Sequence, residues 1–178
     1  MIMFAHMRTI QVVPYNPDWA QAARDEAARL LAIFAPRVLR IHHMGSTAIP
    51  GIKAKPIVDL LVEVDGIQAI DAYNVRMVSL GYIPKGEYGI PGRRLFAKGE
   101  EEVRTHNIHI YQAGNPEISR HLDFRDYLRA HTSEAQAYSL LKEELARIHP
   151  HDINGYNNGK TEFIRDIEQK ARAEKNRL

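Results

Sequence analysis

The spacing of apolar residues changes along the chain and separates predicted strands from predicted helices. The run Val38 to Ile41 and the near-continuous run Ile57 to Val64 have the apolar, β-branched character of buried strands. Over residues 17–34 the apolar side chains instead recur every three or four positions, which predicts a helix that Asn16 caps. The run Ile10 to Val13 predicts a short strand before this helix.

Helix and strand patterns continue to alternate through the middle of the chain. Apolar residues from Ile67 to Val78 predict a helix, which Gly81 ends. Strands are expected between Tyr82 and Tyr111, interrupted by the glycine- and proline-containing loop 85–92.

The last third of the chain is predicted to be helical. Asn115 and Pro116 are the residue types of a helix cap and a first turn, and three apolar stripes at helical spacing follow them. This gives a sheet-bearing part at about residues 9–112 and a helical part at about 115–175. Neither part is long enough to suggest a separate domain, so one α+β domain over residues 1–178 is expected.

One charged residue, Asp59, interrupts the apolar run of the second strand. An unpaired carboxylate there would cost on the order of several kcal/mol unless a cation or hydrogen-bond donors meet it. Gly45, Ser46 and Thr47 precede this strand, and their N–H and hydroxyl groups suit a phosphate. Two simpler roles stay open: a hydroxyl that caps a short helix, and an Asp59 that only orients a lysine or loop N–H groups.

Two familiar phosphate-binding loops do not fit this segment. A P-loop needs glycines four residues apart followed by lysine, whereas five residues separate Gly45 from Gly51, and Ile52 follows. A dinucleotide-binding turn opens a helix, but Pro50 and Pro56 leave room for only a short turn before the next strand.

Several short motifs follow one another in a recognisable order. They are Val13-Pro14-Tyr15-Asn16-Pro17-Asp18-Trp19, His43-Met44-Gly45-Ser46-Thr47-Ala48-Ile49-Pro50-Gly51, Lys55-Pro56-Ile57-Val58-Asp59, Gly81-Tyr82, Phe124-Arg125-Asp126-Tyr127-Leu128, and Tyr156, Lys160, Phe163 and Ile164. This order resembles the GrpB family of the nucleotidyltransferase superfamily. The resemblance implies a nucleotidyltransferase-like mixed sheet with packed helices, a Gly-Ser turn that holds nucleotide phosphates, and strand carboxylates that hold divalent cations.

The acidic motif departs from the superfamily pattern. Leu61 occupies the place of the second acid, so Asp59 and Glu63 are the candidate catalytic acids. These three residues share a strand face, but the Cα atoms of the two acids are roughly 13 Å apart. The strand expected at residues 105–111, where a third acid belongs, has histidines instead. We therefore expect at most one weakly held Mg²⁺, at Asp59. The simpler alternative to a catalytic role for Glu63 is that it is a solvated residue at the rim of the site.

Five basic residues are candidate phosphate ligands. Lys53 and Lys55 follow the Gly-Ser turn, Arg93 and Arg94 follow the glycine-containing loop, and Lys160 belongs to the last motif. Such cations can form an electrostatic seat for a polyphosphate. The simpler alternatives are solvated lysines and arginines that extend from a strand edge.

The spacing of the histidines argues against a histidine metal site within one strand. His42 and His43 are adjacent and His106 and His109 are three apart, so each pair points to opposite strand faces. His43 and His109 could still meet across the sheet near Asp59, as residues that support the site. A hydrogen-bonded polar cluster is the alternative to a metal site there, and no zinc is expected.

Composition excludes several classes of protein. The chain has 24 basic and 22 acidic side chains and a net charge of +2, which does not suggest a dedicated nucleic-acid surface. Cysteine is absent, which excludes disulfides and thiolate metal sites and is compatible with a reducing, cytoplasmic location. No apolar run approaches the roughly 20 residues of a membrane span.

Two functions follow from these observations. The first is transfer of a nucleotidyl group from a nucleoside triphosphate to a small acceptor with Mg²⁺, which the Gly-Ser turn and Asp59 favour. The second is a non-catalytic module that binds a nucleotide or other phosphate ligand, which Leu61 favours. The resemblance supports the second, because the family occurs fused to dephospho-CoA kinase and so implies that enzyme as a partner.

Overall fold

A five-stranded mixed sheet is the centre of the computed structural model, which describes residues 9–99 and 103–177. The strands are β1 (Val38–Met44), β2 (Val58–Val64), β3 (Tyr82–Pro84), β4 (Arg93–Lys98) and β5 (His106–Gln112). Their order across the sheet is β1-β2-β5-β4-β3. The pair β2 and β5 is parallel, and the other neighbouring pairs are antiparallel. The predicted α+β fold with a mixed sheet is confirmed.

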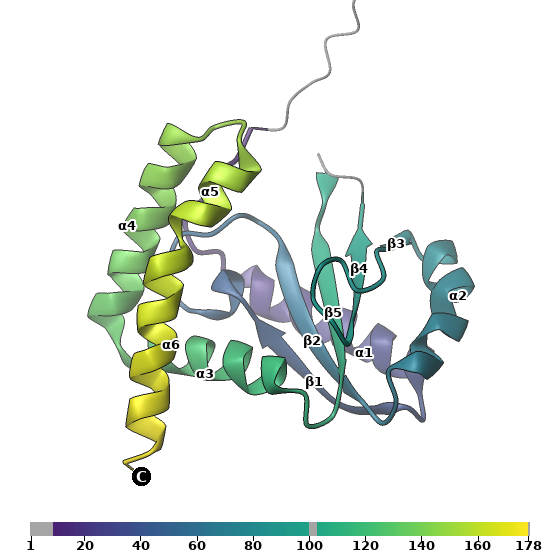
Figure 1. Ribbon diagram of the computed structural model, residues 1–178. Coiled ribbons are helices and arrows are strands. Elements are labelled where there is room, and N and C mark those ends of the chain that lie inside the picture. The colour runs from purple at the N-terminus through teal and green to yellow at the C-terminus, as the bar shows by residue number, and fades with distance from the viewer. Residues whose placement is uncertain (1–8, 100–102, 178) are drawn as a thin grey trace, which may run out of the picture.

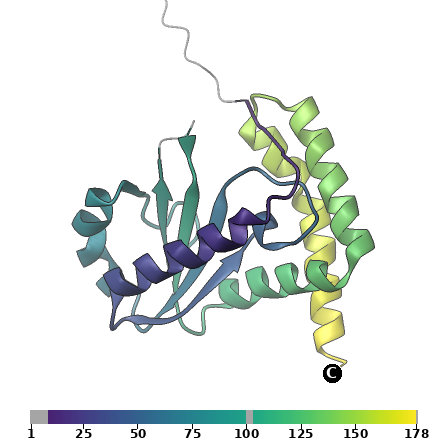
Figure 2. The same cartoon turned by 180° about the vertical axis from the view of Figure 1, so that it is seen from behind.

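Helices lie on one face of the sheet and beside it. Helix α1 (Asp18–Phe34) crosses one face, as Figure 2 shows. The short helices η2 (Gln68–Tyr73) and α2 (Asn74–Ser79) lie at the β3 end of the molecule. At the other end, the carboxyl third forms a helical unit beside the sheet (Figure 1). Its helices are α3 (Pro116–Ala130), α4 (Thr132–Ile148), α5 (Ile153–Gly159) and α6 (Thr161–Lys175).

The main core lies between the sheet and α1. Leu60, Val62 and Val64 of β2 pack in one cluster with Leu30 and Phe34 of α1. Each such side chain stabilises the fold by about 1.5–3 kcal/mol when it is fully buried. This face of the sheet is therefore the structural one.

The opposite face of β2 presents the residues of the predicted acidic motif. Because strand side chains alternate, Asp59, Leu61 and Glu63 point away from α1. Leu61 packs with Tyr111 of β5 and Ile118 of α3, so the first turns of α3 cover the middle of this face. Asp59 lies at the start of β2, on the side of the helical unit.

Local signals in the sequence predicted most of the helices at the correct positions. The Asn16 side chain accepts a hydrogen bond from the Asp18 N–H at 2.9 Å, and Asn115 accepts one from Glu117 N–H at 2.9 Å. The helix expected over residues 67–78 is divided between η2 and α2. None of the helices of the described part of the chain is long and apolar enough to cross a membrane.

Two expectations about elements were wrong. Ile10 to Val13 is not a strand: Val13 forms an isolated bridge with Ala54, and the Ile10 N–H donates to the carbonyl of Pro150. This segment crosses to the helical unit instead of joining the sheet. The carboxyl third has four helices where three stripes were counted, because the seven-residue α5 is too short to form a stripe.

Candidate functional site

The chain approaches the Asp59 side chain closely at Gly45, which lies between β1 and the short helix η1 (Ser46–Ala48). Gly45 has a φ of +73°, a conformation that other residues rarely adopt. A Cβ atom at this position would lie 2.8 Å from Oδ2 of Asp59. Both the turn and the approach to the carboxylate therefore require glycine here.

Hydrogen-bond donors from β5 meet the Asp59 carboxylate. Nδ2 of Asn107 donates to Oδ1 at 3.0 Å, and Nε2 of His109 lies 3.5 Å from the same oxygen. Burial by itself would raise the pKa of Asp59, but His109, Asn107 and the charge of Lys55 lower it below its usual value. A quarter of the side chain stays exposed (25%), so this ionised group can still meet a ligand.

The two hydroxyls of the Gly-Ser turn have different partners. Ser46 is hydrogen-bonded to the hydroxyl of Tyr138, which α4 brings to the mouth of the turn. Thr47 is buried, and its Oγ1 lies 2.9 Å from Nε2 of His43. Burial, with the charges of two arginines, lowers the pKa of His43 to about 4, so this imidazole is neutral at pH 7. Ser46 is thus the hydroxyl on the side of the helical unit, and Thr47 holds the turn from within.

Three lysines, Lys55, Lys142 and Lys160, gather beside this turn and are called the lysine cluster below. Nζ of Lys160 lies 4.3 Å from the centre of the Tyr156 ring, and Nζ of Lys55 lies 5.4 Å from it. Nζ of Lys142 lies 4.7 Å from the centre of the Tyr138 ring and donates to the Lys53 carbonyl. Aromatic faces and one backbone carbonyl thus lie against the ammonium groups of the lysine cluster.

Burial and mutual repulsion act on the charges of the lysine cluster. Burial, followed by the charges of the other two lysines, lowers the pKa of Lys142 to about 7. Burial and the charge of Lys55 lower the pKa of Lys160 to about 8, although Asp59 acts in the opposite direction. An anionic ligand placed between these groups would relieve this repulsion.

The loop from Gly45 to Lys53 is fixed by donors from α3 and α4. These donors reach carbonyls of the loop and of the end of β1: Arg125 to His43 (2.8 Å), Arg129 to Ala48 (2.8 Å), Gln136 to Gly51 (3.2 Å) and Lys142 to Lys53. In addition, the Lys53 N–H donates to Oγ of Ser139 at 2.8 Å. The helical unit therefore sets the position of the Gly45–Lys53 loop, which contains the candidate phosphate-binding turn.

Glu63 is not brought to Asp59. Its Oε1 lies 2.7 Å from Nε2 of His42, at the other end of the strand face, with the fully buried Leu61 between the two acids. The β5 residue level with Asp59 is Asn107, an amide where the superfamily pattern expects an acid. Among the described residues, no group of three histidine, cysteine, aspartate or glutamate side chains could hold a metal ion. The donors do not fit a two-metal centre.

The five basic candidates lie in four different settings. Lys55 and Lys160 belong to the lysine cluster, whereas Lys53 forms an exposed ion pair with Glu143 of α4, 2.6 Å apart. Arg94 points to the α1 face, where its guanidinium donates to both carboxylate oxygens of Asp71 at 2.6 and 2.9 Å.

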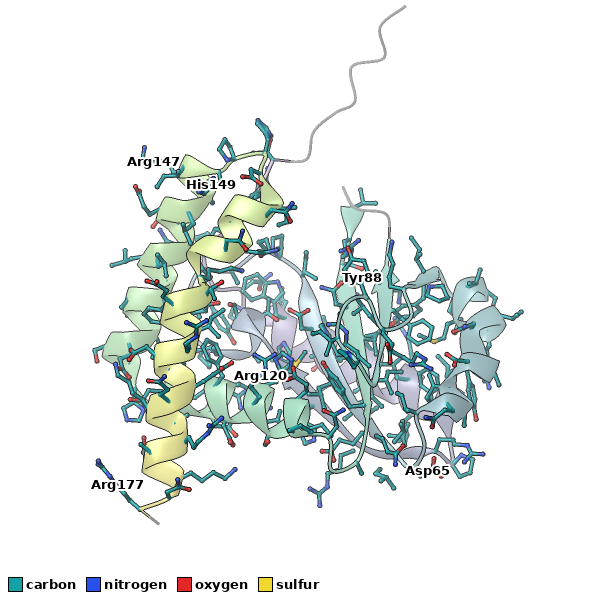
Figure 3. The ribbon with its side chains drawn as sticks, in the orientation of Figure 1. Asp65, Tyr88, Arg120, Arg147, His149 and Arg177 are labelled. Atoms are coloured by element: carbon teal, nitrogen blue, oxygen red, sulfur yellow. The ribbon has the colours of Figure 1, made fainter. Side chains whose placement is uncertain are left out.

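Arg93 points to the same face as Asp59, because neighbouring strand residues alternate. It is buried and donates to the carbonyls of Glu87 and Tyr88, in the loop where Figure 3 marks Tyr88. Another of its nitrogens lies 3.4 Å from Nδ1 of His109. Arg93 thus supports the site through His109 and does not reach the Gly-Ser turn.

His43 and His109 do not meet across the sheet. His43 is level with Leu60, which points to the α1 face, while His109 is level with Leu61 on the opposite face. His109 instead approaches His121 of α3, with the ring centres 6.0 Å apart. Burial is the main cause that lowers the pKa of His121 to about 4.

Lys142, Tyr138 and His121 were not among the site residues expected from the sequence. One signal was present for Lys142: it lies four residues after Tyr138, within the apolar stripe of α4, where a lysine is unusual. Nothing comparable marks His121, because its contacts depend on how α3 packs on the sheet.

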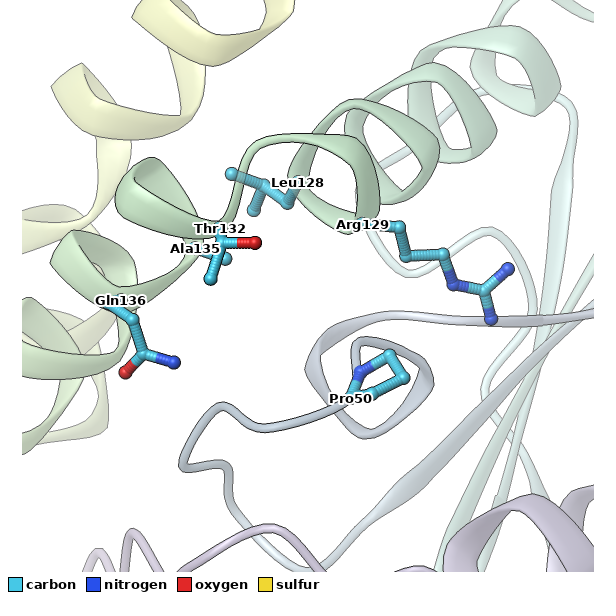
Figure 4. Close-up of a pocket in the computed structure, with 6 residues that line it drawn as sticks. All are labelled: Pro50, Leu128, Arg129, Thr132, Ala135 and Gln136. Atoms are coloured by element: carbon cyan, nitrogen blue, oxygen red, sulfur yellow. The ribbon is translucent and has the colours of Figure 1, made fainter.

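A hollow of about 360 Å³ lies behind the loop, between Pro50 and the junction of α3 and α4 (Figure 4). Arg129 and Gln136, which hold the loop carbonyls, also line it. Its lining does not include Asp59 or the lysine cluster. The candidate site is therefore separate from this hollow.

Comparison of sequences gives a family match that covers residues 9–170, described as GrpB protein. The UPF0157 protein YqkA of Bacillus subtilis is 48% identical over 165 residues, which are 93% of this chain and 48% of YqkA. The chain thus spans about half the length of YqkA. Dephospho-CoA kinase of Mycolicibacterium paratuberculosis is 27% identical, over 91% of this chain and 46% of that enzyme.

Comparison of structures gives two informative similarities. The crystal structure of the conserved protein GrpB from Enterococcus faecalis has a TM-score of 0.87 and 42% identity, over 90% of this chain and 96% of that one. The structure of Cid1 in complex with its short product ApU has a TM-score of 0.51 at 14% identity, over 74% of this chain and 42% of Cid1. The second likeness concerns the fold alone, and it confirms the predicted nucleotidyltransferase-like fold.

Proposed function

The chain belongs to the GrpB family, as its motifs predicted, and from this premise we propose that it binds the phosphate groups of a nucleotide. The lysine cluster is the observation that carries the proposal. Lys55 of the loop, Lys142 of α4 and Lys160 between α5 and α6 converge on the turn at Ser46, beside one carboxylate. A cluster of lysine ammonium groups beside a single carboxylate favours a ligand that carries several negative charges.

The residues of the site would have different roles in binding. The ammonium groups of Lys55 and Lys160 would donate to the phosphates, with the Ser46 hydroxyl beside them. Asp59 lies close to both, because its charge acts on Lys55 and on Lys160. It would therefore orient these lysines and prevent a phosphate from settling directly on the Gly45 turn.

The acidic residues support binding better than transfer. Two-metal phosphoryl chemistry needs carboxylates that bridge ions about 3.5–4 Å apart. Here Asp59 stands alone, Glu63 is bonded to His42, and Asn107 supplies an amide. We therefore propose a non-catalytic ligand-binding module, in which the ligand positions or regulates a partner. A nucleoside triphosphate is a cytoplasmic metabolite, so the proposal includes a cytoplasmic location.

Dephospho-CoA kinase is the partner that the similarities favour. The M. paratuberculosis enzyme contains a segment similar to nearly the whole of this chain, in a protein more than twice as long. We propose that this chain assists such an enzyme, either as part of one polypeptide or as a separate subunit.

Nucleotidyl transfer is the second candidate function. It is favoured by the fold shared with Cid1 and by the conjunction of Gly45, Ser46 and Asp59. In this candidate a single Mg²⁺ would be held weakly, at Asp59. Steady Mg²⁺-dependent release of pyrophosphate from a triphosphate, lost in Asp59→Asn, would establish transfer and overturn the non-catalytic reading.

Calorimetric titration of the purified chain with the four ribonucleoside triphosphates, and then with the monophosphate and nucleoside of the tightest, tests the binding proposal. Affinity should rise with the number of phosphates, because the lysine cluster recognises charge. Lys160→Gln should weaken triphosphate binding by about tenfold and leave nucleoside binding unchanged. The matched control is Lys175→Gln, an exposed lysine of the same helical unit that pairs with Asp123.

Two results would contradict this proposal. One is a triphosphate affinity no greater than that of the nucleoside, with and without Mg²⁺. The other is an equal effect of the Lys160 and Lys175 substitutions, which would mean that net charge and not the site determines binding.

A further inference from the structure

A second hollow, of about 470 Å³, lies between α1 and α2 on the face of the sheet opposite to Asp59. Lys98 of β4 faces this side, because it alternates with Ala97 and shares its face with the core residue Phe96. The volume is in the range of sites that bind small organic molecules. This hollow is separate from the site of the proposed function.

A satisfied carboxylate forms its floor. Glu26 is 2% exposed, and its oxygens lie 2.8 Å from Nζ of Lys98 and 2.9 Å from a guanidinium nitrogen of Arg29. The hydroxyl of Tyr82 donates to the same carboxylate. Burial alone would raise the pKa of Glu26, but Lys98 and Tyr82 lower it below its usual value. The floor is therefore charged and fully bonded within the protein.

The lining nevertheless has an excess of positive charge. Arg29, Arg76 and Lys98 face one acid, Glu26. A guanidinium has five N–H groups. Arg29 uses one terminal nitrogen for Glu26, and Arg76 uses one for the carbonyl of Ile33, 3.3 Å away. Both arginines are exposed, so they bring further donors to the mouth of the hollow.

Part of the remaining wall is apolar. Ile33 of α1 and Leu80, which follows α2, both line the hollow, and Leu80 is 46% exposed. An exposed leucine beside two arginines favours a molecule with an apolar body and an anionic end, and it disfavours a fully hydrated ion.

We propose that this hollow binds a small organic anion, with its charged group between Arg29 and Arg76 and its apolar part against Ile33 and Leu80. The inference goes beyond the proposed nucleotide site. The two sites lie on opposite faces of the sheet and use different cations, so either can fail without the other.

Octanoate is a suitable probe, with octan-1-ol and octylamine as neutral and cationic controls of the same length. Titration of the whole chain, followed by amide chemical shifts, should show octanoate binding with shifts in α1, α2 and β4. Octan-1-ol and octylamine should bind at least about tenfold more weakly, since each lacks the charge-assisted hydrogen bonds to the arginines.

Arg76→Gln should weaken octanoate binding by about tenfold. The matched control is Arg24→Gln, an exposed arginine of α1 that does not line the hollow and bonds to Gln21. The proposal is overturned if octanoate does not bind at concentrations on the order of 10 mM. It is also overturned if octan-1-ol binds equally well, if the Arg24 and Arg76 variants behave alike, or if the shifts fall at residues 45–55 instead.

Discussion

Lys142 holds its ammonium group inside the protein, close to the two other lysines of its cluster. The residue is 2% exposed, and burial together with its lysine neighbours lowers the pKa to about 7. The ordinary value of this group is 10.5. Between these two values the unfolded chain binds a proton that the folded protein does not bind. The folded state is therefore disfavoured by Lys142 at low pH, and this penalty fades as the pH rises.

Substitution of Lys142 by Met should remove this pH dependence. The free energy of unfolding of the unmodified protein should rise by about 2 kcal/mol between pH 7 and pH 9 relative to that of the Lys142→Met variant. Urea unfolding at a series of pH values measures this difference. Lys175→Met, which removes an exposed lysine, should keep the unmodified slope. Parallel curves for Lys142→Met and the unmodified protein would show that Lys142 keeps an ordinary pKa.

Among the elements, α3 and α4 hold the loop of the candidate site in place. Arg125 of α3 donates to the carbonyl of His43, at the point where β1 gives way to the Gly45 turn. A hydrogen bond from a charged donor contributes about 1.5–3 kcal/mol. Arg125→Met should therefore loosen the turn as well as destabilise the fold by about that amount.

Hydrogen exchange measures this loosening directly. The amides of residues 43–48 should exchange faster in Arg125→Met than the loss of global stability explains, while those of β5 should accelerate only as far as that loss requires. Arg147→Met is the matched control, because Arg147 lies on α4 and bonds within that helix to Glu144. Equal exchange of residues 43–48 in both variants would assign the position of the turn to β1 and β2 alone.

The elements that the sequence predicted well are those with local signals. The apolar runs of β1 and β2, the loop before β4 and the caps at Asn16 and Asn115 all depend on neighbours within a few residues. Helix α5 escaped prediction because its one buried large residue, Tyr156, gives no stripe. Its cap was nevertheless readable, since Asp152 accepts a hydrogen bond from the Gly155 N–H at 2.9 Å.

The site was predictable only where a single segment builds it. Gly45, Ser46 and Asp59 lie in one strand-turn-strand unit, and their proximity follows from the motif. The lysine cluster joins Lys55 to Lys142, which are far apart in the sequence, and only packing of α4 on the loop brings them together. The register of the sheet likewise decides that His109, and not His43, reaches Asp59.

For the molecule as a whole, the helical unit and the sheet-bearing part share a second core. Ile49 and Ile52 of the loop are buried with Leu128, Tyr138 and Ile167 of the helices. Without the helical unit, these two isoleucines would be exposed to water. Each would lose about 1.5–3 kcal/mol of stabilisation, which is a large part of the stability of a small protein.

A chain that ends at residue 114 should therefore fail to fold cooperatively. We expect its amide spectrum to be poorly dispersed and its urea unfolding to lack the sharp transition of the whole chain. The whole chain, unfolded under the same conditions, is the control. A well-dispersed spectrum from residues 1–114 would show that the sheet-bearing part is a domain by itself.

The burial of Leu61 also limits how this surface can change in evolution. The codons for asparagine and aspartate differ at one nucleotide. A single-nucleotide change at Asn107 can therefore place an acid level with Asp59. Leu61 is different, because Met44, Tyr111 and Ile118 surround it and a carboxylate there would have no donor in that cluster. An acid at position 61 would first disrupt the packing of α3 on the sheet. The loss of stability would therefore come before any catalytic advantage, and selection would act against the intermediate.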